Sequence, residues 1–279
     1  MNVSIPGLSP LFPQVHCTSS GEICQITAGE SEINAATSVM ALALASSAVG
    51  HSLLDLRKTY FLAAGIAGVN PKLATLGGVG IARFAVQVAL QYEIDAREMP
   101  DGFDTGYLPY GVNSSRDYPV TQYGTEVMEL NSALRDKAVD LARRAKLNDT
   151  AGAAAHRVLY AAAEDDVYQA ATRGPAVSAC DAATSDVYYS GSMLSEAFET
   201  TTRIWTNQSE TTYCMTAQED VAVLQALMRA HLWGLVDYTR AMVLRTGERA
   251  RKLPIYPTFS TGGLISKCQV LTSTVRHRT

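Results

Sequence analysis

The sequence predicts an α/β protein. Strand-like and helix-like segments alternate along its 279 residues, and no internal repeat or low-complexity linker divides them. Residues 58–68 are almost wholly apolar, as in a strand buried on both faces, whereas residues 126–147 have the spacing of an amphipathic helix. A chain of this length can bury one large core, and we expect residues 1–279 to form a single α/β domain.

In the first half of the chain, residues 22–29 predict a short strand that ends in glycine. Residues 30–47 predict a helix whose first turn is acidic, which suits the helix dipole. The buried strand at 58–68 follows, and then residues 82–95 alternate between apolar and polar types, as a half-buried strand does.

In the second half, residues 104–126 form a long loop rich in Gly, Pro and Tyr, which we expect to border a site or to act as a lid. The helix at 126–147 comes next. Residues 178–191 predict a strand and a turn, with a helix after them from about 193 to 201. Residues 216–247 predict a long helix and a final strand that ends near Arg245.

The composition indicates an ordered globular protein, because 47% of the residues are hydrophobic and 18% are charged. The net charge of −4 gives no electrostatic reason to expect a nucleic acid partner. The most apolar stretch, residues 33–50, contains Asn34 and Thr37 and is short for a bilayer. We therefore expect a buried helix of a soluble protein there, and no membrane span.

The five cysteines leave two interpretations open. Cys17 and Cys24 flank a turn-like segment and would staple a hairpin, Cys180 and Cys214 would form a second pair, and Cys268 would stay single. Alternatively, all are free buried thiols in a reducing cytosol. The spacing matches no zinc site, so no metal is expected.

Four sequons place candidate glycosylation sites at Asn2, Asn113, Asn148 and Asn207. No signal peptide is visible after Met1, since the chain runs directly into a polar segment that contains proline. The localisation therefore stays open.

Three loops are expected to follow strands, namely 65–78, 184–191 and the residues from Arg245 onward. Ligands of open α/β sheets lie beyond the carboxyl ends of strands, so these loops would meet at one pocket if their strands are neighbours. The glycine-rich turn at 65–78 would offer backbone N–H groups to an anion or a hydroxyl. The alternative is that these glycines only permit tight packing.

Three side chains near these loops suit a small ligand. Glu219 would accept hydrogen bonds from a diol, and Tyr188 and Tyr189 offer flat faces to an aromatic ring. The alternatives are that Glu219 complements a helix dipole and that one tyrosine lies in the core and the other on the surface.

Long blocks of the chain resemble the purine nucleoside permease family of fungi and bacteria, from about residue 3 to residue 263. They include VHCTSSGEICQITAGESEINAATSVMALAL, DLRKTYFLAAGIAGVNPKLATLGGVGIARFAVQVALQYEIDAREMP, ACDAATSDVYYSGSMLSEAFE and TTYCMTAQEDVAVLQAL. The family is similar, more distantly, to the nucleoside phosphorylase and nucleosidase fold. The resemblance implies a three-layer architecture with a central mixed sheet flanked by helices, here expected to lack the first strand. Residues 264–279 diverge from the family.

The resemblance also implies roles for named residues. Gly65, Ala67 and Gly68 match a turn that approaches the sugar and the leaving base, and Gln218 and Glu219 match the positions that bind ribose. A carboxylate suits this task because it makes charge-assisted bonds to both hydroxyls. Asp186, Val187 and Tyr188 would neighbour the purine.

Catalysis is the point at which the chain departs from this pattern. Cleavage of an N-glycosidic bond needs an acid that protonates the departing purine, and the fold usually supplies an Asp in a Ser-Asp step after the last strand. Glu248 and Arg249 stand at that step here. Glu248 is the candidate substitute, although its longer side chain is shifted by one residue.

The resemblance implies purine nucleoside recognition, with nucleosides of the adenosine, guanosine and inosine class as ligands and N-glycosidic cleavage as an associated activity. Phosphate would be a co-substrate if the cleavage is phosphorolytic; no other cofactor is expected. The family is secreted or associated with the cell surface, and a homo-oligomer is the expected assembly. Two alternatives stay open: a catalytically inactive nucleoside-binding component of uptake, and a truncated gene product without function.

Overall fold

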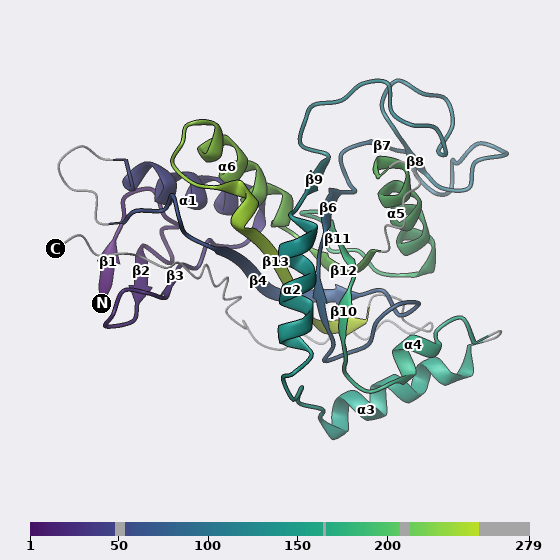
Figure 1. The fold of residues 1–279 in the computed structure, drawn as a ribbon. Helices are drawn as coiled ribbons and strands as arrows, with labels where there is room; N and C mark the ends of the chain where they lie inside the picture. The colour runs from purple at the N-terminus through teal and green to yellow at the C-terminus, as the bar shows by residue number, and fades with distance from the viewer. Residues whose placement is uncertain (48–53, 164–165, 207–212, 251–279) are drawn as a thin grey trace.

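A large mixed β-sheet forms the centre of the molecule (Figure 1). The computed structural model describes residues 1–47, 54–163, 166–206 and 213–250. The strands lie in the order β10-β5-β13-β4-β12-β11-β6-β9. β6, β11 and β12 run parallel to one another, as do β4 and β13, whereas β12 and β4 are antiparallel. The strands are β4 (Phe61–Val69), β5 (Val79–Ile81), β6 (Phe84–Gln87), β9 (Val127–Glu129), β10 (Val177–Ala179), β11 (Asp181–Thr184), β12 (Tyr213–Ala217) and β13 (Ala241–Ala250).

Helices cover both faces of this sheet, which confirms the predicted three-layer α/β architecture. Successive residues of a strand face opposite sides. Val243 of β13 packs with α1 (Ser31–Ala45) and α6 (Asp220–Leu232), whereas its neighbour Leu244 packs beside α2 (Ser132–Ala142). The helix α5 (Ser192–Trp205) covers β6, β11 and β12 on the same face as α2.

The helices α1 and α6 lie side by side on one face of the sheet (Figure 1). Their buried residues are mostly Ala, Val and Leu, and small side chains allow two helices to approach closely. The predicted helix at 30–47 is therefore confirmed, as is its burial. In the part of the chain that the structure describes, no helix combines the length and the hydropathy that a bilayer crossing requires.

Smaller elements surround the main sheet. An antiparallel sheet near the N-terminus and a two-stranded ribbon, which pairs residues 92–93 with residues 107–108 of the predicted loop, are the remaining β-structure of the described residues. These elements are β1 (Asn2–Ser4), β2 (Gln14–Cys17), β3 (Cys24–Gln25), β7 (Tyr92–Glu93), β8 (Tyr107–Leu108), α3 (Ala151–Val158), η1 (Leu159–Ala162), α4 (Gln169–Thr172) and η3 (Tyr238–Arg240).

Both predicted disulfides form. Cys17 and Cys24 are directly paired across β2 and β3, with a Cα–Cα distance of 4.0 Å. Cys180 and Cys214 join the start of β11 to β12, with a Cα–Cα distance of 5.7 Å. The free-thiol alternative is wrong for these four residues. Cys268, the sequon at Asn207 and the divergent tail at 264–279 lie outside the described residues.

Two helix predictions begin too early. Residues 127–129 form β9 instead of a first helical turn, and Asn131 caps the N-terminus of α2 by accepting a hydrogen bond from the backbone of Leu134. Residues 213–217 form β12, and α6 begins only at Asp220. β12 is buried on both faces, so it shows no polar alternation that separates it from the helix that follows.

The strands around the expected glycine turn also differ from the prediction. Gly65 to Gly68 lie inside β4, which continues to Val69, so the bend begins only at Asn70. The last strand does not end near Arg245 but continues to Ala250, and the third expected loop therefore does not start at Arg245. The strand predicted at 82–95 is divided between β6 and β7.

Candidate functional site

The carboxyl ends of β6, β11 and β12 lie at the same edge of the sheet, because these three strands are parallel neighbours. Gln87 ends β6, Asp186 follows β11, and Glu219 lies between β12 and α6. The N-terminus of α1 meets this edge, since the backbone N–H of Glu32 donates to Asp186 Oδ1 at 2.9 Å. Segments far apart in the sequence thereby converge on one site.

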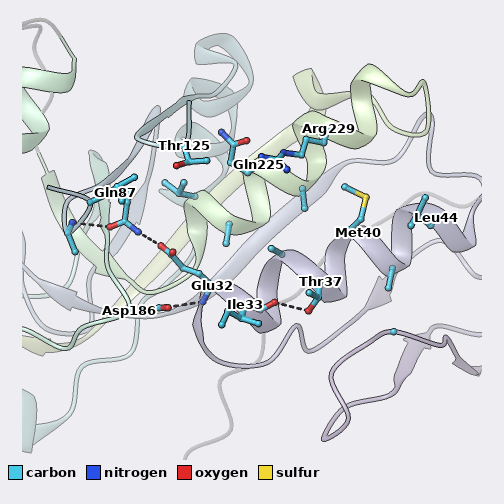
Figure 2. A pocket seen from close by; sticks show the side chains of 18 of the residues that line it. Glu32, Ile33, Thr37, Met40, Leu44, Gln87, Thr125, Asp186, Gln225 and Arg229 are labelled. Carbon is cyan, nitrogen blue, oxygen red and sulfur yellow. Dashed lines mark hydrogen bonds between the residues drawn. The ribbon is translucent and has the colours of Figure 1, made fainter. Parts of the chain in front are cut away.

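A pocket of about 910 Å³ opens at this edge and extends along the groove between α1 and α6 (Figure 2). Pockets for small ligands have volumes of roughly 300–1,000 Å³. The walls are largely aliphatic, and polar groups gather at the end that lies near the sheet. The lining includes Glu32, Ile33, Thr37 and Met40 of α1, Val221, Ala222, Gln225 and Arg229 of α6, and Gln87, Thr125, Asp186 and Val187 of the connecting segments.

Glu32 is the central polar group of this end (Figure 2). Its carboxylate accepts a hydrogen bond from the side-chain amide of Gln87, and the carbonyl of that amide accepts one from the backbone of Ala89 at 3.0 Å. Burial, followed by the negative charges of Asp186 and Glu219, raises the pKa of Glu32 from 4.5 to about 7. The carboxyl group therefore holds a proton for part of the time near neutral pH.

The first turn of α1 has an unusual backbone. Ser31 has a φ of 76°, a left-handed conformation that is uncommon outside glycine. Such strain is found where surrounding structure imposes it, often at functional sites. Here the conformation accompanies a helix start at which the backbone N–H of Glu32 donates to the Asp186 carboxylate, so that Asp186 serves as the cap.

A buried ion cluster lies behind the pocket. Arg245 of β13 is 2% exposed, and its Nε donates to both carboxylate oxygens of Asp220, at 3.0 and 3.1 Å. Its Nη1 lies 3.7 Å from Glu219 Oε1. Burial alone would lower the pKa of Arg245, but the two carboxylates outweigh it and raise that pKa. Arg245 therefore remains a cation that neutralises carboxylates inside the protein.

The ion cluster around Arg245 explains why residue 65 is a glycine. A Cβ at Gly65 would lie 2.6 Å from Arg245 Nη1, which also reaches toward the carbonyl oxygen of Ile66 at 3.5 Å. Glycine in β4 thus makes room for a guanidinium group of the same protein. Tight packing, one of the two interpretations of the glycine-rich segment, explains the glycine at this position.

The ion cluster and the pocket are neighbours. Gln218 donates from Nε2 to the carbonyl oxygen of Asp186 at 3.5 Å, and the charge of Glu219 acts on the pKa of Glu32. The carboxylates Glu32, Asp186 and Glu219 are therefore close enough to influence one another, although they come from three different segments of the chain.

Of the residues expected to bind the base, Asp186 and Val187 line the pocket. Tyr188 is exposed and donates its hydroxyl hydrogen to Glu30, beside the start of α1. Tyr189 points into the core, where its hydroxyl donates to that of Tyr213 at 3.2 Å. The tyrosine pair thus divides between surface and core.

The residues expected to bind ribose lie one layer further in. Gln218 and Glu219 are buried and do not contribute to the pocket lining, and neither do Gly65, Ala67 and Gly68 of β4. They are nevertheless next to one another, because Gly68 pairs with Thr216 of β12 and Arg245 contacts both Gly65 and Glu219.

Glu248, the expected catalytic acid, is an exposed residue of β13. It lies at an irregularity of the strand, between Gly247 and Arg249, which pair with Ala67 and Gly68 of β4. It is not part of the pocket lining. Its role in catalysis stays a prediction.

Sequence reasoning missed Glu32, Gln87, Gln225 and Arg245. The acidic first turn that contains Glu32 suggested only a complement to the helix dipole. Arg245 could have been predicted from the sequence, because it ends the apolar run AMVLR. An arginine in a central strand is buried, and a buried arginine needs carboxylate partners. Within the described part of the chain, no group of His, Cys, Asp and Glu has an arrangement that could hold a metal ion.

Comparisons with known proteins add family evidence. The family model described as Purine nucleoside permease (NUP) matches residues 1–251. The purine nucleoside permease of Candida albicans is 47% identical over 250 residues, which amount to 88% of this chain and 58% of that protein. A probable purine nucleoside permease of Schizosaccharomyces pombe is 41% identical over 255 residues, or 88% of this chain and 70% of that protein. The chain thus spans little more than half of the length of the Candida relative.

Solved structures with similar chain paths include two 5′-methylthioadenosine/S-adenosylhomocysteine nucleosidases. The protein from Colwellia psychrerythraea is 12% identical with a TM-score of 0.47, and the match covers 90% of this chain and 74% of that one. The protein from Helicobacter pylori is 13% identical with a TM-score of 0.45, and the match covers 90% and 76%.

Proposed function

The chain belongs to the purine nucleoside permease family, and from that premise we propose that it binds purine nucleosides in the pocket between α1 and α6. One observation carries the choice of site. The pocket joins an aliphatic groove to a polar end that holds Glu32, Gln87 and Asp186, and a nucleoside likewise joins a flat base to a hydroxyl-rich sugar.

The polar end suits the ribose. Asp186 offers carboxylate oxygens to hydroxyl groups, and such charge-assisted bonds are roughly twice as strong as neutral ones. The carboxyl group of Glu32 lies beside it at the same end of the pocket. Gln218 donates to the backbone of Asp186 from behind, and the negative charge of Glu219 raises the pKa of Glu32. The ribose-binding role expected for Glu219 stays a prediction.

The groove suits the base. Ile33 and Val187 are 77% and 66% exposed, and both line the pocket, so a planar ring can cover them. Burial of apolar surface contributes about 25 cal/mol per Å². Gln225 lies on the α6 side of the groove, where its Nε2 donates to the carbonyl oxygen of Gly124 at 2.6 Å. Its Oε1 can accept a hydrogen bond from an exocyclic amino group.

Calorimetric titration with inosine, adenosine and guanosine tests this proposal, with uridine as the pyrimidine control. The variant Thr37→Trp fills the groove, because Thr37 is an exposed lining residue whose hydroxyl donates only to its own helix at Ile33 and Asn34. We expect its affinity for inosine to fall at least about tenfold, or about 1.4 kcal/mol.

Thr172→Trp is the matched control. Thr172 is also exposed, and its hydroxyl also donates to its own helix, at Gln169, but it lies outside the pocket lining. Its affinity for inosine should equal that of the wild type. The proposal is wrong if no purine nucleoside binds, or if Thr37→Trp binds inosine as the wild type does.

A second candidate function is cleavage of the N-glycosidic bond, favoured by a carboxyl group with a pKa of about 7 inside the pocket. A general acid works best when its pKa lies near the working pH. Incubation with inosine, followed by chromatography for free hypoxanthine, tests this activity. Release that requires phosphate indicates phosphorolysis, release without phosphate indicates hydrolysis, and binding without release indicates a nucleoside-binding component of uptake.

A further inference from the structure

Resting on the proposed function, we propose that Glu32 is the proton-binding residue of the pocket and that a purine nucleoside binds to the form in which this carboxyl group is protonated. Nucleoside binding would then take up a proton from solvent. The ligands of the pocket would then be neutral nucleosides, each of which binds together with one proton.

The position of Glu32 is fixed from two sides. Its backbone N–H is held by Asp186, and one carboxylate oxygen is held by the amide of Gln87. The amide of Gln87 is oriented in turn by the backbone of Ala89 at 3.0 Å. The side chain of Glu32 is therefore held at the wall of the pocket, where a ligand can meet it (Figure 2).

The groups around Glu32 favour its neutral form. β6 contributes the neutral amide of Gln87, the turn after β11 contributes the Asp186 carboxylate, and the start of α6 contributes the Glu219 carboxylate. The nearest buried cation, Arg245, is engaged by Asp220 and Glu219. Arg229 of α6 lines the pocket farther along the groove (Figure 2) and is exposed. With burial, these surroundings raise the pKa of Glu32 to about 7.

A bound nucleoside strengthens the preference of Glu32 for its protonated form. It covers the carboxyl group and removes water, but it brings no cation to the site, so the cost of an ionised Glu32 rises. The neutral carboxyl group instead donates its O–H to an acceptor on the ligand, such as a ring nitrogen or a hydroxyl oxygen. Proton and nucleoside therefore bind together.

The expected pH dependence follows from the fraction of protonated Glu32. If only that form binds, the apparent dissociation constant equals the intrinsic one divided by this fraction. With a pKa of about 7, inosine binds about tenfold more weakly at about pH 8 than at about pH 6. The proton uptake is about half a proton per inosine at about pH 7 and close to one at about pH 8.

The experiment titrates inosine by calorimetry between about pH 6 and pH 8, in PIPES and in imidazole buffer, whose different ionisation enthalpies reveal the proton uptake. Glu32→Gln keeps a neutral group of the same shape, so its affinity should match the low-pH affinity of the wild type within about twofold and stay flat with pH. Glu98→Gln, at an exposed glutamate outside the pocket, should keep the wild-type pH dependence.

The outcomes separate this inference from the proposed function. Inosine binding that does not change with pH and takes up no proton overturns the inference and leaves the proposed function intact, as does a Glu32→Gln variant with wild-type pH dependence. Absence of binding at every pH overturns the proposed function itself. The proton uptake of the wild-type protein decides the question even if Glu32→Gln does not fold.

Discussion

Substitution of Gly65 by alanine tests the buried ion cluster most directly. The added Cβ would lie 2.6 Å from Arg245 Nη1, closer than real Cβ atoms approach other heavy atoms. The end of an arginine side chain can usually move away, but this one is 2% exposed and its Nε is held by both oxygens of Asp220. Gly65→Ala must therefore displace the guanidinium group from its partners or shift β4.

The magnitude follows from two opposing effects. Overpacking of a well-packed core costs typically about 1–3 kcal/mol, and weakened charge-assisted hydrogen bonds to Asp220 place this site in the upper part of that range. Gly65 has no left-handed backbone, so alanine restricts the unfolded chain and returns about 0.4–1 kcal/mol. We expect Gly65→Ala to lower the free energy of unfolding by about 1–2.5 kcal/mol.

Urea unfolding followed by circular dichroism measures this loss. Gly152→Ala is the control, because nothing lies within 4 Å of a Cβ added at Gly152 in α3. Since alanine favours the helix more than glycine does, this variant should be more stable by about 0.5–1 kcal/mol. Arg245→Lys removes Nη1 and keeps the charge, so Gly65→Ala should cost little in that background. A Gly65→Ala protein as stable as the wild type, or an equal cost in both backgrounds, would refute the steric argument.

Two further predictions concern stability. The pKa of Glu32 is raised in the folded state from 4.5 to about 7, so its contribution to stability is lost as the pH rises through that window. Because Glu32 is only half-buried, the full effect of this pKa shift is reduced by solvent. Between about pH 5 and pH 8, the free energy of unfolding should therefore fall by about 1–2 kcal/mol more in the wild type than in Glu32→Gln. Urea unfolding at each pH measures both losses, and equal losses would contradict the environment assigned to Glu32. The double variant Cys180→Ala/Cys214→Ala opens a loop with a sequence separation of 34, and its free energy of unfolding should fall by about 3–4 kcal/mol. Reduction of the wild type should cost at least as much, because it also opens the Cys17–Cys24 disulfide, and no change in either case would exclude this origin.

The α/β class could be predicted from the alternation of strand-like and helix-like segments, whereas the three-layer architecture was implied by the family resemblance. The helix at 30–47 and the strand at 58–68 were predicted close to their bounds in α1 and β4. β12 was missed, since a strand buried on both faces has the same apolar letters as the helix that follows it. Its position between β4 and β11 depends on pairing between distant segments, which local patterns do not encode.

The site was predictable only in part, for a physical reason. Asp186 and Val187, which line the pocket, were expected from the family resemblance, and their loop was expected at a site because it follows a strand. Glu32 was missed because its environment comes from β6, β11 and α6 rather than from its own helix. Sequence can identify a carboxyl group, but burial and charged neighbours set its pKa, and those are properties of the fold.

The arrangement of charges connects the core of the sheet to the pocket. Asp220 receives the close contacts of the Arg245 guanidinium, whereas Glu219 lies 3.7 Å from it, so the charge of Glu219 is the less neutralised of the two. That residual charge is one of the influences that keep Glu32 from ionising at neutral pH. Gly65 permits the guanidinium to lie where it does, and its bare backbone thus affects the pocket through two intervening charges. On this argument the glycine-rich strand, the buried arginine and the pocket carboxyl group form one electrostatic unit.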